Sequence, residues 1–329
     1  MTADVRVYLL TYRRNHLLPR ALNSLLAQTH KNWICEVHND DPLDPFPEKL
    51  IAETNDPRIT YQPHARNLGP VANFDHVFQP VREPFVSLLE DDNWWEPRLL
   101  ERLLAAIAPH PSINLAWANC YMWRETDAGD WEQAGTIWPT DGDAVTIFDT
   151  PDPRQACRAL HSNGAMLLRA IPETMIKSPA SVRFAVIEQV RERAYPGKLL
   201  LVREPLGNYA LTRETSRNET ADENMQMTVL LALTLMMRCP DTAEFYQRMW
   251  TACCGSLGHQ QRGLIVAGAM AGRLRRVLLS ATFSELLVVA AWAVRHPRRF
   301  ANLFAATKRF PDVFEFLKAA GARNAVGAK

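Results

Sequence analysis

Short apolar runs alternate with amphipathic segments through the first 110 residues of the chain. The apolar runs have the length and composition of buried strands, and each ends in polar residues. The segments between them repeat Leu and Ala at helical spacing. This alternation predicts an open, mostly parallel sheet with helices on its faces. The predicted strands are 5–10, 33–38, 59–61 and 84–89, and the predicted helices are 15–26, capped by Asn15, 71–79, and 97–107, opened by Pro97.

The pattern changes twice after residue 110. Residues 124–153 are rich in Asp, Gly, Pro and Trp and are expected to form a long surface excursion. The C-terminal part is helical in pattern and rich in Ala, Leu, Met and Arg. We therefore expect two domains, 1–220 and 221–329, the first consisting of the halves 1–110 and 111–220. Further strands are predicted at 111–118, 164–169 and 198–202, with a helix at 181–195.

The amino-acid composition indicates the broad class of protein and shows that charge is unevenly distributed along the chain. The chain has 329 residues, of which 47% are hydrophobic and 22% are charged, as in ordinary soluble globular proteins. The formal net charge is only +1, so the chain as a whole has no general attraction for nucleic acid. Residues 1–230 carry 23 Lys and Arg against 31 Asp and Glu, whereas residues 231–329 carry 14 against 5. An acidic front and a basic tail imply surfaces with different partners.

Cysteine usage and hydropathy bear on the cellular compartment. The six cysteines form no C-x-x-C pair, and we expect reduced thiols in a cytosolic protein. The first residues lack the pattern of a signal peptide. The longest apolar stretch, 278–294, is broken by Ser, Thr and Glu and falls short of the roughly 20 residues that a spanning helix needs. The nine histidines are scattered without metal-ligand spacing. These features together predict a cytoplasmic protein.

Three adjacent carboxylates, Glu90-Asp91-Asp92, follow the strand predicted at 84–89. Ligands of parallel sheets bind at the carboxyl ends of the strands. Mg²⁺ and Mn²⁺ prefer oxygen ligands and often take only one or two from the protein, the rest coming from phosphates and water. Such a cation would offset the charge of a departing diphosphate. The alternative is a solvated helix N-terminus, where acidic side chains suit the helix dipole.

The sequence around this triplet resembles the inverting family 2 glycosyltransferases, which have the GT-A fold. That fold is a mixed, mostly parallel nucleotide-binding sheet flanked by helices, here with a helical C-terminal extension. The family's D-x-D motif ends an apolar strand and precedes Trp and Pro, as in residues 88–100, LLEDDNWWEPRLL. The resemblance covers about residues 5–217. The other matching segments are Thr11-Tyr12-Arg13-Arg14, Asn39-Asp40, Asn67-Leu68-Gly69 and Asn73.

The resemblance implies which residues hold the donor. Asp92 matches the last position of the D-x-D motif and is the expected ligand of Mn²⁺ or Mg²⁺. Glu90 stands at the first position, where the family has Asp. Thr11 and Tyr12 would line the pocket for the base. The expected nucleotide-sugar-binding residues are Thr11, Tyr12, Arg14, Asn39, Asp40, Asn67, Gly69, Asn73, Glu90 and Asp91.

The same resemblance implies residues on the acceptor side. Inverting transfer needs a general base near the acceptor hydroxyl, and Glu188-Gln189 stands where the family has a Glu-Asp pair. Glu188 is therefore the expected base, with a surface Glu on an amphipathic helix as the alternative interpretation. Asp149 and Asp152 are fallback candidates. The expected acceptor-binding residues are Trp94, Ser162 and Asn163, with a simple turn as the alternative interpretation of the last two. Arg213 and Ser216 are expected to donate hydrogen bonds to phosphate oxygens.

Residues 262–309 interleave apolar side chains with arginines and a lysine. The favoured interpretation is a helical lid that packs on the catalytic domain and exposes a solvated basic face. The alternative is peripheral contact with the inner face of a membrane, because a basic amphipathic helix can lie on an anionic bilayer surface.

Three functions are compatible with these observations. The first is a metal-dependent inverting glycosyltransferase that moves a sugar from a nucleotide-sugar to an acceptor hydroxyl, in surface or secreted glycan biosynthesis. Its acceptor would be a glycan, a lipid-linked molecule or a small molecule, and a homo-oligomer is compatible with it. A nucleotidyltransferase would want a Gly-rich phosphate loop, which Thr11-Tyr12-Arg13-Arg14 lacks. The third is a non-catalytic nucleotide-sugar-binding protein on the same fold, suggested by Gln189.

Overall fold

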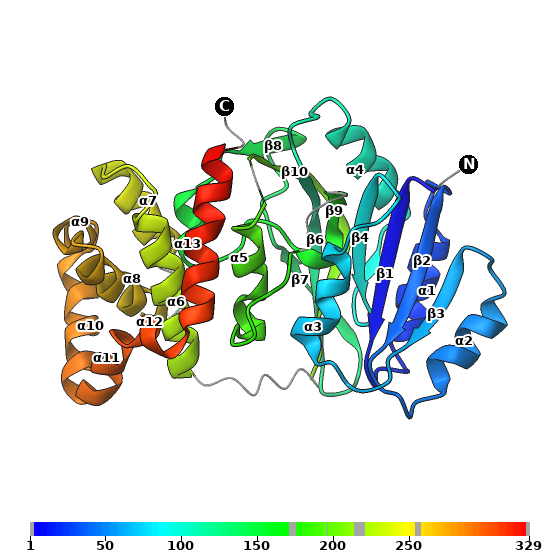
Figure 1. The fold of residues 1–329 in the computed structure, drawn as a ribbon, viewed down its shortest axis with the longest axis horizontal. Helices are drawn as coiled ribbons and strands as arrows, with labels where there is room; N and C mark the ends of the chain where they lie inside the picture. Colours follow the sequence, from blue (N-terminus) through cyan, green and yellow to red (C-terminus); the bar gives the residue numbers. More distant parts are fainter. Residues whose placement is uncertain (1–2, 171–175, 196, 214–220, 254–257, 327–329) are drawn as a thin grey trace. The chain divides into compact units, whose positions relative to one another are not determined.

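Ten strands form one mixed sheet in the computed structural model, which describes residues 3–170, 176–195, 197–213, 221–253 and 258–326 (Figure 1). The strand order is β3-β2-β1-β4-β9-β6-β10-β5, with β7 paired to β6 and β8 to β10. Strands β3, β2, β1 and β4 are parallel, as are β6 and β10, and the other pairs are antiparallel. The strands are β1 (Val5–Thr11), β2 (Trp33–Asn39), β3 (Ile59–Pro63), β4 (Phe85–Glu90), β5 (Trp94–Trp95), β6 (Leu115–Glu125), β7 (Trp131–Thr136), β8 (Val145–Phe148), β9 (Met166–Arg169) and β10 (Leu199–Leu211).

Apolar side chains bury the parallel half of the sheet on both faces. Leu9 of β1, Val37 of β2 and Leu89 of β4 are fully buried in one core cluster. Leu22 and Leu103 from two flanking helices complete this cluster. Burying each such side chain stabilises the fold by about 1.5–3 kcal/mol, which explains why continuous apolar runs form these strands. The helical elements beside the sheet are α1 (Leu18–Leu26), α2 (Phe46–Thr54), α3 (Pro70–Phe74), η1 (Asp75–Phe78), α4 (Leu99–Ile107) and η3 (Asn163–Ala165).

Helix starts differ from those predicted. Helix α1 begins at Leu18, and its N-cap residue is Leu17, which makes no side-chain cap bond. The predicted cap by Asn15 is therefore wrong. Helix α4 begins at Leu99, and the side chain of Gln28 accepts a hydrogen bond from the backbone N–H of Leu100 (3.1 Å). A side chain distant in sequence thus accepts from a backbone N–H at the helix start, where no local side chain caps the helix. Helix α2 was not predicted.

The tract 124–153 is more regular than its composition suggests. Strand β7 extends the sheet beside β6, and β8 pairs with β10, so the predicted surface excursion is partly wrong. The strand predicted at 198–202 is the first part of a longer strand, β10, which continues to Leu211 and whose register shifts near Pro205. Non-local pairing with β6 holds these segments together, and local pattern does not reveal it.

Contacts divide the chain into two units. Unit 1 comprises Met1–Phe148, His161–Lys177 and Gly197–Ser216, and unit 2 comprises Asp149–Leu160, Ser178–Pro196 and Arg217–Lys329. Unit 2 thus includes two stretches that lie inside the domain expected at 1–220. Unit 2 contains η2 (Pro153–Ala156), η4 (Phe184–Val186), α5 (Ile187–Glu192), α6 (Ala221–Met236), α7 (Ala243–Ala252), α8 (His259–Met270), α9 (Leu274–Leu279), α10 (Phe283–Arg295), α11 (Pro297–Leu303), α12 (Ala306–Arg309) and α13 (Pro311–Val326).

A disulfide within unit 2 corrects the expectation of six reduced thiols. Cys157 and Cys253 are bonded, with their Cα atoms 5.8 Å apart, whereas Cys35, Cys120 and Cys239 are buried thiols outside any disulfide. The partners are 96 residues apart in sequence, so spacing gave no sign of the pair. Among the described residues, no helix is both long and apolar enough to cross a membrane.

Candidate active site

The register of the parallel strands brings three predicted loops to one edge of the sheet. Leu10 of β1 pairs with Glu90 of β4, and Thr11 pairs with Asn39 of β2. The three strands therefore end at the same level. Tyr12, Asp40 and Asp91, the residues that follow these pairs, lie together at the carboxyl edge, where ligands of such sheets bind.

A single arginine holds the two aspartates of the acidic triplet. The guanidinium of Arg14 donates from Nη1 to Oδ1 of Asp91 (3.3 Å) and to Oδ2 of Asp92. The backbone N–H of Tyr12 donates to the other oxygen of Asp91 (3.0 Å). Both aspartates are buried. The acidic triplet is therefore not a solvated helix N-terminus, which was the alternative interpretation of the sequence.

Burial raises the affinity of the two carboxylates for protons, although the guanidinium of Arg14 lies beside them. Desolvation, reinforced by the charge of Asp92, raises the pKa of Asp91 to about 7, although Arg14 opposes the shift. Desolvation likewise raises the pKa of Asp92, against the opposing charge of Arg14. The pKa of Arg14 is itself raised, because the charges of both aspartates outweigh its burial. The pair thus has a deficit of positive charge.

Oxygen ligands with such a deficit fit a hard divalent cation. Asp92 offers a buried carboxylate at the strand end, and no Cys or His among the described residues is hydrogen-bonded or ion-paired to Asp91 or Asp92. Mg²⁺ and Mn²⁺ favour this donor chemistry. The carboxylates of Asp91 and Asp92 already accept hydrogen bonds from Arg14, so a cation at Asp92 would share that carboxylate with Arg14.

Asp40 supports a loop through both of its oxygens. Oδ1 accepts from the backbone N–H of Leu68 (2.7 Å) and contacts Nδ1 of His64 (2.9 Å), and Oδ2 accepts from the N–H of Gly69 (3.0 Å). Gly69 has φ 79°, a left-handed value that favours glycine. Asp40 therefore holds the 64–69 loop, in addition to its predicted place beside the nucleoside.

The three predicted asparagines occupy different environments. Asn39 is buried, and its side chain bonds the backbone of Asp41 and Asp44 and the hydroxyl of Tyr61. Asn73 is buried on α3, and its Oδ1 has no hydrogen-bond partner among the described residues. Asn67 is exposed on the 64–69 loop. Asn73 is therefore the member of this set with a buried acceptor that a ligand could satisfy.

Glu90 faces the segment predicted to bind the acceptor. Its Oε2 accepts from the side chain of Asn93 (2.6 Å), whose Oδ1 accepts from the N–H of Ala210 (2.9 Å). A Cβ on Gly164 would lie 3.1 Å from Oε2 of Glu90, which is tighter than most Cβ contacts and would require the Glu90 side chain to shift. Ser162 and Asn163, directly before Gly164, are buried and open the one-turn helix η3. The structure thus brings the donor-side and acceptor-side predictions of unit 1 together.

An aromatic and basic cluster lies beside Asp92. Arg20 donates to the backbone carbonyl of Asp92 (2.8 Å) and stacks over Trp94 (3.8 Å to the ring centroid) and Trp131 (4.5 Å). Desolvation lowers the pKa of Arg20 to about 10. Trp123 contacts Trp94 with ring centroids 5.6 Å apart. Of these residues, only Trp94 was predicted. Trp123 and Trp131 lie on the β6–β7 pair, which was not predicted, and Arg20 lies on α1 with no local signal of its contacts.

The remaining predicted residues fall outside this carboxylate cluster. Arg213, at the end of β10, donates to the carbonyl of Asp127 (2.9 Å) and pairs with Glu125. Ser216 lies outside the described residues. Glu188 is half-buried on α5, which belongs to unit 2. Of the fallback residues, Asp152 caps η2 and pairs with a neighbouring arginine, which lowers its pKa despite burial. Asp152 is thus a structural cap.

Comparison with solved structures shows the fold. S. aureus TarS 1-349 superimposes with a TM-score of 0.53 at 13% identity, covering 98% of this chain and 92% of that chain. Its complexes with UDP and with UDP-GlcNAc give TM-scores of 0.55 at 12% identity with the same coverage. The mixed, mostly parallel sheet with flanking helices and a helical C-terminal region is therefore of the GT-A type, as predicted.

Comparison at the sequence level finds a family match within the N-terminal part. Residues 7–157 match the model of Glycosyl transferase family 2, so the predicted resemblance is confirmed over this segment. WcaA of Escherichia coli (strain K12), assigned as a colanic acid biosynthesis glycosyl transferase, is 28% identical over 119 residues. That match spans 36% of this chain and 43% of WcaA, less than half of the relative.

Replacing Asp91 should change how stability depends on pH. Its folded-state pKa, about 7, lies above the ordinary value of 3.8, so the folded protein binds this proton more tightly than the unfolded chain does. The stability that results is fully present below about pH 4 and is lost as the pH rises through 7. In Asp91→Asn, the fall in the free energy of unfolding between pH 4 and 7 should shrink by on the order of 1 kcal/mol or more.

Urea denaturation at a series of pH values measures this difference. Asp130→Asn, at an exposed position, is the control and should follow the wild type. Parallel curves for Asp91→Asn and the wild type would show that Asp91 is not the buried acid described above.

Proposed function

We propose that the protein is a glycosyltransferase that transfers a sugar from a nucleotide-sugar donor to an acceptor hydroxyl with inversion at the anomeric carbon. The observation that carries this proposal is the buried Asp91–Asp92 pair, held at the common edge of β1 and β4 within a family 2 segment. Carboxylates are costly to bury, so a pair placed where sheet ligands bind favours function over stability alone.

The donor would lie along the carboxyl ends of β1, β2 and β4. Tyr12, which is 42% exposed, offers an aromatic face for the base, and Thr11 and Asp40 lie beside it. Asn67, Gly69 and Asn73 would border the nucleotide from the 64–69 loop and α3. Arg213 and Ser216 would bind phosphate oxygens, for which arginine is well suited because it donates charge-assisted hydrogen bonds.

Asp92 would hold Mn²⁺ or Mg²⁺, with Glu90 and Asp91 beside it. Bound there, the cation supplies positive charge that offsets the negative charge of the diphosphate. Arg14 and Arg20 contribute positive charge from the protein itself, at the carboxylate and the backbone carbonyl of Asp92. The ring of Trp94, stacked with Arg20, would give the acceptor an apolar surface next to Ser162 and Asn163.

Glu188 would act as the general base. In an inverting transfer the carboxylate removes the proton of the acceptor hydroxyl while that oxygen attacks the anomeric carbon from the face opposite the diphosphate. The bond between the anomeric carbon and the diphosphate oxygen breaks, and the nucleoside diphosphate leaves with the bonding electron pair. The half-buried position of Glu188 on α5 supports this role, because its partly buried neighbourhood limits competition from water.

Surface or secreted glycan is the acceptor class that we propose. The name of the relative WcaA refers to colanic acid biosynthesis, which supports this context. The sugar and the individual acceptor molecule follow from neither the fold nor the carboxylate cluster.

Asp92→Asn should abolish the binding of nucleoside diphosphate that depends on the divalent cation. Binding to the folded state stabilises the wild type by about 2.7 kcal/mol when the ligand is at 100 times its Kd. Thermal unfolding with UDP or GDP, with and without Mn²⁺, measures the gain. UDP is the first choice because the structural neighbour TarS was solved with UDP. Asp130→Asn should behave as the wild type, and a metal-dependent gain that survives in Asp92→Asn would exclude Asp92 as the ligand.

Glu188→Gln should separate catalysis from donor binding. The glutamine keeps the size of the side chain but cannot accept the proton, so turnover should fall by about 10²–10⁴-fold. Nucleoside diphosphate binding should be unchanged. Release of nucleoside diphosphate from a nucleotide-sugar measures turnover, and Glu244→Gln, on the exposed start of α7, is the matched control in the same unit. Wild-type turnover in Glu188→Gln would assign the base to another residue.

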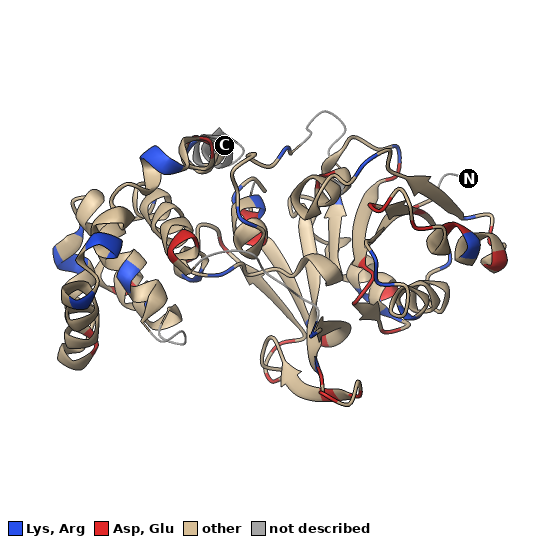
Figure 2. Cartoon of the chain, turned by 90° about the horizontal axis from the view of Figure 1, so that it is seen from below, with Lys and Arg blue, Asp and Glu red and all other residues tan. Residues whose placement is uncertain are grey.

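We also propose that α9 and α10 contact an anionic membrane at its inner face. Leu279, Phe283, Leu287, Val288 and Val294 are large apolar residues that are 52–81% exposed. Exposed arginines border them, and Figure 2 shows basic segments on the helices of unit 2. An apolar face with a basic border is the pattern of an interfacial helix. The basic residues at this border are Arg275, Arg276, Arg295 and Arg298.

Sedimentation with vesicles tests the membrane contact. The wild type should bind vesicles that contain anionic phosphatidylserine and lose most of this binding on neutral phosphatidylcholine. Phe283→Ser with Leu287→Ser should reduce binding about tenfold or more, since each side chain contributes on the order of 1.5 kcal/mol or more when buried. The membrane proposal is wrong if the wild type sediments with neither kind of vesicle. If the same double variant then converts a dimer into a monomer, the apolar face of α9 and α10 joins two copies of the chain.

A further inference from the structure

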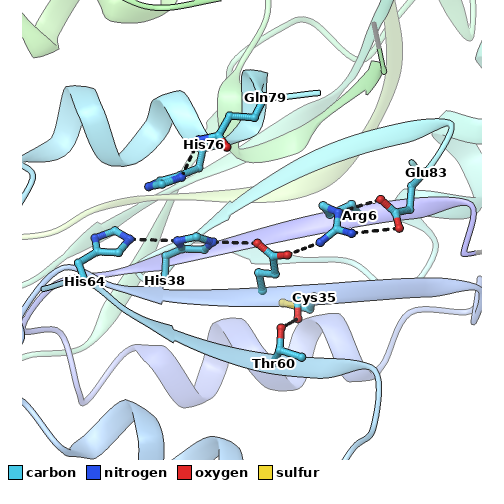
Figure 3. A network of polar contacts seen from close by, with 9 residues as sticks. Arg6, Cys35, His38, Thr60, His64, His76, Gln79 and Glu83 are labelled. Atoms are coloured by element: carbon cyan, nitrogen blue, oxygen red, sulfur yellow. Dashed lines mark hydrogen bonds and ion pairs between the residues drawn. The ribbon is translucent and has the colours of Figure 1, made fainter. Parts of the chain in front are cut away.

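Three histidines from separate parts of unit 1 meet beside the donor edge of the sheet. His38 is on β2, His64 follows β3, and His76 is on the one-turn helix η1. One ring nitrogen from each lies within 4.8 Å of the other two. Figure 3 shows the rings of His38 and His64 side by side, with His76 above them. Residue spacing does not predict this cluster, because its members are far apart in the chain.

Carboxylates hold the outer nitrogens of two of the rings. Nε2 of His38 lies 3.1 Å from Oε2 of Glu36, and Nδ1 of His64 lies 2.9 Å from Oδ1 of Asp40. When these nitrogens donate to the carboxylates, Nδ1 of His38 and Nε2 of His64 carry the lone pairs. These two atoms are 3.0 Å apart and face one another. A carboxylate behind the imidazole is the arrangement that orients histidine ligands of metals.

His76 supplies a third nitrogen. The nitrogen of the Gln79 side-chain amide lies 2.9 Å from Nδ1 of His76. When the amide is turned by 180°, its oxygen faces the ring and accepts the Nδ1 proton. Nε2 then carries the lone pair, and this buried atom has no hydrogen-bond partner among the described residues. Burial and the neighbouring imidazoles lower the pKa of His76 to about 4, so the ring is in the neutral form that metals bind.

The polar network around the rings has a deficit of positive charge. Arg6 pairs with Glu83 (2.8 Å) and with Glu36 (Figure 3). Asp40, on the other side of the rings, contacts His64 and has no ion pair with Arg6 among the described residues. These three carboxylates and one guanidinium have a formal charge of −2 with neutral histidines. A divalent cation among the rings would balance it.

We propose that His38, His64 and His76 bind a transition-metal ion of the zinc class. Three imidazole nitrogens and one open position suit Zn²⁺, with each nitrogen 2.0–2.1 Å from the metal and the nitrogens roughly 3.3 Å from one another. His38 and His64 are already close to this separation, and His76 reaches it by a small shift of its side chain. Nitrogen ligands distinguish this site from the oxygen ligands of Asp92, which favour Mn²⁺ or Mg²⁺.

The site joins three elements that the covalent chain leaves separate. It links β2, the 64–69 loop and η1, and it shares Asp40 with the backbone N–H groups of Leu68 and Gly69. Metal bound there would hold this loop in place. The proposal depends on neither glycosyl transfer nor the metal at Asp92.

Zinc uptake by the full chain tests the site. Protein stripped with a chelator is dialysed against a small excess of Zn²⁺, and bound metal is counted by elemental analysis; a competing chromophoric chelator gives the affinity. The wild type should bind one zinc per chain at this site and gain thermal stability from it. His76→Ala should weaken this binding at least 100-fold, and Glu36→Gln, which removes the charge behind His38, should weaken it about 10-fold.

Two controls separate this site from adventitious binding and from misfolding. His110→Ala removes a histidine of unit 1 outside the cluster, and Asp92→Asn alters the oxygen site; both should retain the bound zinc. Thermal unfolding of zinc-free His76→Ala checks that the variant is folded. If the stripped wild type takes up no zinc, or if folded His76→Ala binds it as tightly as the wild type, the three rings are only a hydrogen-bonded chain and the proposal is overturned.

Discussion

The candidate active site depends on one electrostatic constraint, which is that two buried carboxylates share a single guanidinium. Moving a carboxylate out of water costs several kcal/mol, and the fold tolerates it at Asp91 and Asp92 because Arg14 and the N–H of Tyr12 donate to them. These donors come from the loop after β1, whereas the acceptors come from the end of β4. The pairing therefore requires β1 and β4 to be adjacent, parallel and in register, and the apolar core of the sheet provides that arrangement.

The same edge of the sheet contains two chemically different sets of ligands. Carboxylate oxygens gather at Asp92, and imidazole nitrogens gather at His38, His64 and His76. Asp40 lies between the two regions. Its side chain contacts His64, and its backbone N–H donates to the carbonyl of Thr11 (3.0 Å), next to Tyr12, whose N–H donates to Asp91.

Several residues that the family resemblance assigns to the donor make extensive contacts within the protein. Asn39 uses its whole side-chain amide to hold the turn after β2, and Asp40 uses both oxygens on the following loop. Such bonds fix loop geometry before a ligand arrives, which reduces the entropy lost on binding. Holding a loop and binding the donor are compatible roles when the residue orders the loop that lines the donor pocket.

Local sequence patterns are sufficient to predict the strands of the parallel half and the position of the acidic triplet. Apolar runs predict β1, β2 and β4 because most of their side chains are buried, and the polar residues after them mark the strand ends. The acidic triplet with Trp94 and Pro97, taken together with the other matching segments in the same order, indicates the family resemblance. These features are local, so a single stretch of chain carries the signal.

Tertiary structure alone decided the contacts between residues distant in sequence. It placed Arg14 on both aspartates, Arg20 between Trp94 and Trp131, and Gln28 at the start of α4. It also assembled the three histidines and paired Cys157 with Cys253. Sheet register and core packing set these distances, and no periodicity or spacing along the chain encodes them, because each depends on where another part of the chain has folded.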